Sequence, residues 1–146
     1  MNQVKGLVPD GAVLLDLPAD SKDEVLQQLA ALAGRLLPID AGAALAALQQ
    51  RERLGTTGLG GGIAIPHARL GSLDDSIALL ARLRRPLDFN AVDGEPVDLV
   101  LVLFTPERAG NDHLKALAKA ARALRDPELR TSLRAAPDVA AARHLL

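Results

Sequence analysis

The chain has 146 residues, of which 49% are hydrophobic and 24% charged, and its formal net charge is −1. This balance is typical of a globular domain and argues against disorder over most of the length. Because the chain has no cysteine, a disulfide framework, a thiolate nucleophile and a cysteine-ligated metal site are excluded. There is no basic excess, and the only aromatic side chains are Phe89 and Phe104, so nucleic acid is not expected as a partner.

The sequence carries no targeting or membrane signal. It lacks the basic start and apolar run of a secretory signal, and no stretch approaches the roughly 18 uninterrupted apolar residues of a membrane-spanning helix. We therefore expect a cytoplasmic protein without membrane insertion. The length fits a single domain over residues 1–146, in which residues 1–11 lack periodicity and form a loosely ordered start.

The first part of the chain predicts one strand and two helices. Residues 12–17 (AVLLDL) favour a short strand. A helix begins at Ser21, with a glutamate at capping-box spacing three residues later, and Pro38 ends it. Asp40 caps a second helix that runs to about Arg53.

The middle of the chain predicts strands separated by turns. Residues 54–71 (LGTTGLGGGIAIPHARLG) contain a glycine-rich turn and a buried strand at 63–65. Residues 77–82 and 97–104 favour two stronger strands. The second is almost continuously apolar, as expected for a strand covered on both faces.

The last part of the chain is helical. Residues 112–125 have apolar residues at helical spacing. Asp126-Pro127 places an N-cap and a first-turn proline before a further helix, and Pro137-Asp138 precedes a last short one. Helices thus flank the strands in sequence. This order predicts an α/β fold with a mixed central β-sheet covered by helices.

The glycine-rich segment does not match common nucleotide-binding motifs. No Gly-Lys-Ser/Thr follows it, as a P-loop requires. A strand and a proline stand where the dinucleotide fingerprint requires a helix. The histidines are the more informative residues.

His67 is the first candidate for chemistry. It follows Pro66, which fixes its own φ and keeps the preceding residue extended, so His67 projects from a stiff strand end. The nearby Gly61 and Gly62 allow backbone to approach a phosphate closely. The alternative is an ordinary histidine beside a sharp turn.

Three other residues could act with His67 on an anion. His113 lies in the first turn of a predicted helix, where backbone amides favour a negative charge. Arg51 and Arg69 carry guanidinium groups that match phosphate oxygens. Each also has an ordinary explanation, as a helix-start residue, a helix-end charge and a solvated surface charge respectively.

The segment RERLGTTGLGGGIAIPHAR resembles the active-site signature of enzyme IIA domains of the bacterial phosphoenolpyruvate-dependent phosphotransferase system, in the fructose/mannitol class. In that family the histidine of Ile-Ala-Ile-Pro-His is phosphorylated, and here it is His67. The family's active-site arginine and second histidine fall on Arg51 and His113. The family's usual glycine after the first histidine is Ala68 here.

The later segments PLDFNAVDGEPVDLVLVLFTPE and HLKALAKAARALRD are similar to the nitrogen-related, regulatory branch of this family. The resemblance implies the enzyme IIA fold and a phosphotransferase component that works through a phosphohistidine. The donor would be a phosphorylated histidine carrier protein, with no cofactor and no metal. Gly61, Gly62 and Arg69 are further candidates for contact with the phosphoryl group.

Several questions stay open at this stage. The output would be regulatory target proteins, with a potassium transporter or a sensor kinase as candidates. The first alternative is a sugar-transport enzyme IIA that passes the group to an enzyme IIB. A second is an interaction domain that is not phosphorylated, and a third is a metal site at the two histidines. The sequence leaves open the phosphorylated ring nitrogen and the oligomeric state.

Overall fold

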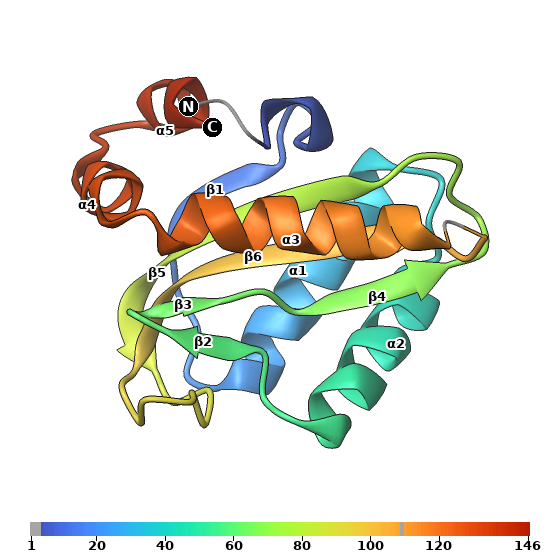
Figure 1. Cartoon of the computed structure of the whole chain (residues 1–146), viewed down its shortest axis with the longest axis horizontal. Helices are drawn as coiled ribbons and strands as arrows, with labels where there is room; N and C mark the ends of the chain where they lie inside the picture. Colours follow the sequence, from blue (N-terminus) through green and yellow to red (C-terminus); the bar gives the residue numbers. More distant parts are fainter. Residues whose placement is uncertain (1–3, 109) are drawn as a thin grey trace.

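A computed structural model describes residues 4–108 and 110–146 of the chain. They form one six-stranded mixed sheet with helices on both faces, which confirms the predicted fold class (Figure 1). The elements in chain order are η1 (Lys5–Leu7), β1 (Val13–Leu17), α1 (Lys22–Leu36), α2 (Ala41–Leu54), β2 (Gly58–Gly60), β3 (Ile63–Ala64), β4 (His67–Leu70), β5 (Ile77–Leu87), β6 (Val97–Pro106), α3 (Asn111–Arg125), α4 (Pro127–Ala135) and α5 (Val139–Leu145).

The strand order is β1-β5-β6-β3-β2, with β4 also paired to β6. β5 and β6 are antiparallel, whereas β1 runs parallel to β5, and β3 and β4 run parallel to β6. Because β5 occupies one edge of β6, β3 and β4 share the other: β3 lies beside Leu99 and Val100, and β4 beside Leu103 to Pro106. β2 pairs with β3, so β4 forms an open edge at that end of the sheet.

The core is centred on β6. Its residues from Leu99 to Phe104 are fully buried, which agrees with the almost continuously apolar run in the sequence. α1 and α2 pack together on one face of the sheet, and α3 lies on the other face and runs along β6 (Figure 1). Burial of each large apolar side chain contributes roughly 1.5–3 kcal/mol, so this strand holds the two layers together.

Side-chain caps define the starts of α1 and α2 that the sequence predicts, whereas α3 has no side-chain cap. Ser21 Oγ accepts from the Glu24 amide at 3.1 Å, and Asp40 Oδ2 accepts from the Ala43 amide at 2.9 Å. The Glu24 carboxylate accepts from the Asp20 amide at 2.8 Å, one residue earlier than a capping box requires. Each cap satisfies an amide that has no partner inside its helix.

Some elements differ from the prediction. β2 and β4 were not predicted, because three or four residues rich in glycine or charge give no alternating pattern. β5 extends to Leu87, beyond the predicted end at residue 82. Of the predicted loose start, residues 1–3 lie outside the described part. Val4 and Val8, however, are buried in the core, so the rest of that segment is packed.

Arg82 ties β5 to the C-terminal helices. Its side chain is only 14% exposed, and Nη1 donates to the carbonyls of Leu133 at 3.0 Å and Ala136 at 2.8 Å. These carbonyls lie at the end of α4, where backbone acceptors lack helical partners. A charged donor thus fixes the end of α4 against the sheet.

We predict that Arg82→Met lowers the free energy of unfolding by about 1–3 kcal/mol, because it keeps the aliphatic stem but leaves these carbonyls without their charged donor. Urea denaturation measures the loss. Arg85→Met is the matched control, since Arg85 lies on the same strand, is 66% exposed and pairs with an exposed Asp20. Its effect should stay within about 0.5 kcal/mol. Equal losses would show that the cap at α4 contributes nothing particular.

Candidate functional site

Four of the predicted site residues meet in one open cavity of about 410 Å³, namely Arg51, His67, Arg69 and His113. Arg51 comes from the last turn of α2, His67 and Arg69 from β4, and His113 from the first turn of α3. β4 can bring these elements together because it forms the open sheet edge between α2 and α3. The two histidine rings lie with their centroids 5.7 Å apart.

The hydrogen bonds of His67 define its protonation state. Nδ1 lies 2.8 Å from the carbonyl oxygen of Ile65, which can only accept, so Nδ1 carries the proton. Arg51 Nε lies 3.2 Å from Nε2 and can only donate, so Nε2 presents its lone pair. The neutral ring therefore has one fixed tautomer, with its free lone pair on Nε2.

The surroundings of His67 keep the ring neutral. Burial is the main cause of the lowered pKa of His67, and the nearby charge of Arg51 lowers it further. The Ile65 carbonyl and the Glu52 carboxylate act in the opposite direction on this pKa, since both favour the protonated ring. The net result is a histidine whose pKa lies below its ordinary value of 6.5, so the ring keeps a free lone pair near pH 7.

The guanidinium of Arg51 is held from two sides. Besides its contact with His67, its Nη1 donates to the carbonyl of Gly55 at 2.9 Å. A guanidinium has five N–H groups in a planar fork, so these two contacts leave further donors on the same group. Arg51 is therefore oriented at Nε2 of His67 and has donors left for anionic oxygens.

His113 faces His67 across the cavity and is itself 8% exposed. Its Nδ1 hydrogen-bonds to the hydroxyl of Thr105 on β6. Burial lowers the pKa of His113, and the charges of Arg69 and His67 lower it further. The second histidine is thus also neutral near pH 7, with its ring held against the sheet.

Glu52 is a residue that the sequence reasoning missed. Its side chain is only 6% exposed, and its carboxylate accepts from Lys22 Nζ at 3.1 Å and from both the amide and the hydroxyl of Thr57. The Thr57 carbonyl in turn accepts from the Ile65 amide at 3.0 Å, and Ile65 holds the His67 ring. A signal was present, since Glu52 lies four residues after the buried Leu48 on the inner face of α2.

The structure does not bring Gly61 and Gly62 to this cavity. They form the turn between β2 and β3, away from the end of β3 that leads to His67. The Gly61 amide donates to Asp93 at 3.0 Å, and its carbonyl accepts from Arg134. A Cβ on Gly62 would lie 2.3 Å from Arg134 Nη2, and its φ is +80°. These glycines permit close packing against α4, so the predicted phosphate contact has no support here.

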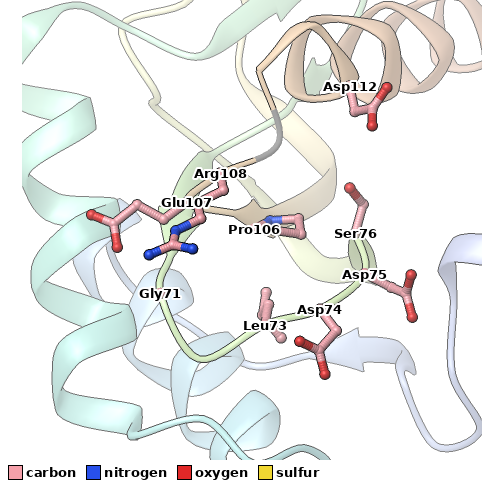
Figure 2. A pocket seen from close by; sticks show the side chains of 9 residues that line it. All are labelled: Gly71, Leu73, Asp74, Asp75, Ser76, Pro106, Glu107, Arg108 and Asp112. Atoms are coloured by element: carbon pink, nitrogen blue, oxygen red, sulfur yellow. The ribbon is translucent and has the colours of Figure 1, made fainter.

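A larger cavity of about 640 Å³ lies between the β4–β5 loop and the start of α3. Four of its nine lining residues are acidic, namely Asp74, Asp75, Glu107 and Asp112, and Arg108 also lines it. Figure 2 shows these carboxylates spread around the rim and pointing in different directions.

Two further candidate features are absent from residues 4–108 and 110–146. No helix among them is long and apolar enough to cross a membrane. No three histidine, cysteine or carboxylate side chains in this part of the chain are grouped so as to hold a metal ion.

Comparison with known proteins places the chain in a family. Residues 7–146 match the family model described as phosphoenolpyruvate-dependent sugar phosphotransferase system, EIIA 2. A nitrogen regulatory protein of Bradyrhizobium diazoefficiens is 49% identical over 138 residues, which cover 94% of this chain and 90% of the relative. A fructose-specific EIIA component of Haloferax volcanii is 35% identical, covering 91% of this chain and 87% of the relative.

The fold comparison agrees. The crystal structure of nitrogen regulatory protein IIA-Ntr from Neisseria meningitidis superposes with a TM-score of 0.90 at 32% identity and covers 97% of both chains. The chain therefore belongs to the EIIA 2 family of the phosphoenolpyruvate-dependent phosphotransferase system. Its similarity to nitrogen regulatory proteins confirms the resemblance to the regulatory branch.

We predict opposite shifts in the pKa of His67 from two neutralising variants. Glu52→Gln removes a carboxylate that raises this pKa and should lower it further, whereas Arg51→Gln removes a cation and should raise it. A pH titration of the ring nitrogens by NMR measures both, with the urea-unfolded chain as reference. Shifts of the same sign would contradict the assigned roles.

The lowered pKa also has a consequence for stability. As pH falls below 6.5, the unfolded chain binds a proton at His67 before the folded chain does. The free energy of unfolding should therefore decrease as the pH is lowered from 6.5 to the pKa of His67 in the folded chain. Replacement of His67 by Gln should reduce this slope.

Proposed function

We propose that this chain is a phosphoryl carrier, which accepts the phosphoryl group of a phosphorylated histidine carrier protein on Nε2 of His67 and acts as a nitrogen- or potassium-related regulator. The observation that carries the proposal is the fixed tautomer of His67. A neutral ring with its Nε2 lone pair beside a guanidinium is equipped to attack phosphorus. The family membership supports the same donor chemistry.

The transfer step balances without any additional proton donor or acceptor. The lone pair on Nε2 of His67 forms the new N–P bond, and the N–P bond on the donor histidine breaks. The electron pair of the broken bond returns to the donor's ring nitrogen. His67 keeps its proton on Nδ1, where the Ile65 carbonyl accepts from it and stabilises the positive charge that the ring gains.

Arg51, His113 and Arg69 act on the phosphoryl oxygens. Phosphoryl transfer depends mainly on positioning and on stabilisation of the oxygen charge. In the resting site the Arg51 guanidinium already lies at Nε2, so its donors can bind equatorial oxygens as the group arrives. His113 donates from across the cavity, and Arg69 adds positive charge on its rim.

The protein surface around the cavity suits contact with another protein. Leu54 lines the cavity and is 81% exposed, and Leu114, next to His113, is 61% exposed. Phosphorylation of His67 adds a charge of roughly −1.5 to −2 between these apolar side chains, if phosphohistidine resembles other phosphorylated residues. A regulatory target can therefore distinguish the two states by local charge, without a rearrangement of the sheet.

A second candidate function is that of a sugar-transport enzyme IIA, which passes the group to an enzyme IIB. The fructose-specific relative supports it, whereas the higher identity to a nitrogen regulatory protein favours the first. The two differ in the last step only. Phosphorylated protein mixed with purified IIB domains should keep its label if the regulatory role holds, and rapid onward transfer would favour the sugar-transport role.

In a reconstituted relay of phosphoenolpyruvate, the first enzyme and the carrier protein, we predict that the wild type takes up acid-labile phosphate. His67→Gln should abolish uptake because the nucleophile is lost. Arg51→Gln should slow uptake by roughly a hundredfold, as expected for a lost donor to developing oxygen charge. Radiolabel incorporation over time measures both rates.

Two controls distinguish the site from its neighbourhood. His144→Gln and Arg53→Gln change exposed residues of the same types and should leave the rate unchanged. Label on the His67→Gln protein would show that another residue accepts the phosphoryl group. A wild type without any label would overturn the proposed function and favour an unphosphorylated interaction domain.

A further inference from the structure

Thr105 is a fully buried polar residue next to the site, and sequence reasoning gave it no role. It lies on β6 directly beside Arg69 of β4, just as Leu103 lies beside His67. Neighbouring residues in paired strands point to the same face of a sheet, and residues two apart along a strand do too. Thr105 therefore points to the α3 face, where its hydroxyl meets His113 Nδ1.

The hydrogen-bond inventory of this contact decides where the protons lie. Among the described residues, the Thr105 hydroxyl has one hydrogen-bond partner, which is Nδ1 of His113. A buried hydroxyl proton without an acceptor is unfavourable, and the only acceptor offered here is a bare Nδ1 lone pair. If Nδ1 of His113 carried a proton, the Thr105 hydroxyl oxygen would accept that hydrogen bond. The proton of the hydroxyl would then be buried without an acceptor.

We propose that Thr105 is a positioning residue that donates its hydroxyl proton to Nδ1 of His113 and thereby holds the proton of the neutral ring on Nε2. Nδ1 is the nitrogen held against β6, and the His113 ring lines the cavity that it shares with His67, so Nε2 is the nitrogen left to serve that cavity. His113 then acts as a hydrogen-bond donor to the phosphoryl group. Thr105 touches no reacting atom and acts only through this ring.

The two histidines then have opposite tautomers. This difference deepens the proposed function of the site. His67 has its proton on Nδ1 because a backbone carbonyl accepts it, which leaves Nε2 for attack. His113 has its proton on Nε2 because a hydroxyl donates to Nδ1. One ring thus offers a lone pair and the other an N–H. The burial that lowers both pKa values keeps each ring in the neutral form, in which this difference exists.

The first test is spectroscopic and needs no phosphoryl transfer. Long-range proton–nitrogen correlation spectra of the ¹⁵N-labelled wild-type protein near pH 7.5 report which ring nitrogens carry protons. We expect a pyrrole-type shift for Nε2 and a pyridine-type shift for Nδ1 of His113, with the reverse for His67. A pyrrole-type Nδ1 on His113 would overturn the assignment.

The second test compares Thr105→Val with Thr105→Ser. Valine keeps the shape but loses the hydroxyl, so the Nδ1 resonance of His113 should move away from its hydrogen-bonded position and phosphoryl uptake should slow by about tenfold. This loss is smaller than that of a removed donor because the imidazole remains. Serine restores the hydroxyl and should restore both the Nδ1 shift and most of the rate. If valine changes neither, or serine rescues neither, the proposal is wrong.

Val100→Ala is the matched packing control. Val100 is fully buried on the same strand and pairs with Ala64 and Ala81, outside the site. It should lower stability without changing the His113 ring spectrum. Because the inference rests on the proposed function only for its kinetic part, the outcomes separate. A wild type that takes up no phosphate overturns the proposed function, while the ring spectra decide the role of Thr105 independently.

Discussion

The site depends on the parallel pairing of β4 with β6. β3 occupies the first part of that edge of β6, and β4 occupies the part that follows. β3 and β4 are consecutive pieces of one chain interrupted at Ile65 and Pro66, and the interruption turns the Ile65 carbonyl toward the ring of His67. β2 covers β3 but not β4. His67, the first residue of β4, therefore lies at an uncovered edge of the sheet, where the C-terminal end of α2 and the N-terminal end of α3 can contact it.

Burial and charge act together on the two histidines. A solvated histidine beside an arginine would exchange between tautomers and protonation states. Here each ring has one defined partner on Nδ1, an acceptor for His67 and the Thr105 hydroxyl for His113. Desolvation and the neighbouring guanidinium groups disfavour the imidazolium form. The outcome is a pair of neutral rings, with Arg51 at Nε2 of His67.

The rest of the molecule holds this edge in place through polar contacts at element ends. The Glu52 carboxylate on α2 accepts from Thr57, and the Thr57 carbonyl accepts from the Ile65 amide. The helix carrying Arg51 is thereby coupled to the segment that orients His67. Away from the site, Arg82 donates to a carbonyl at the C-terminal end of α4. Arg134 of α4 donates to the carbonyl of Gly61 in the turn between β2 and β3. Gly61 and Gly62 pack against α4 there, whereas the cavity at His67 is lined by charged and imidazole side chains.

The sequence by itself determined the long elements, their caps and the order of the main site residues. Hydrophobic periodicity and capping chemistry are local, so α1, α2, α3 and β6 could be predicted, and the signature around His67 predicted the phosphoryl acceptor that we propose. Only the tertiary structure decided the short strands, the hydrogen-bond partners of the two histidine rings, and the contacts of Thr105 and Glu52. Those depend on contacts between segments far apart in the chain, and a hydroxyl or carboxylate has no local pattern that tells which buried partner it will meet.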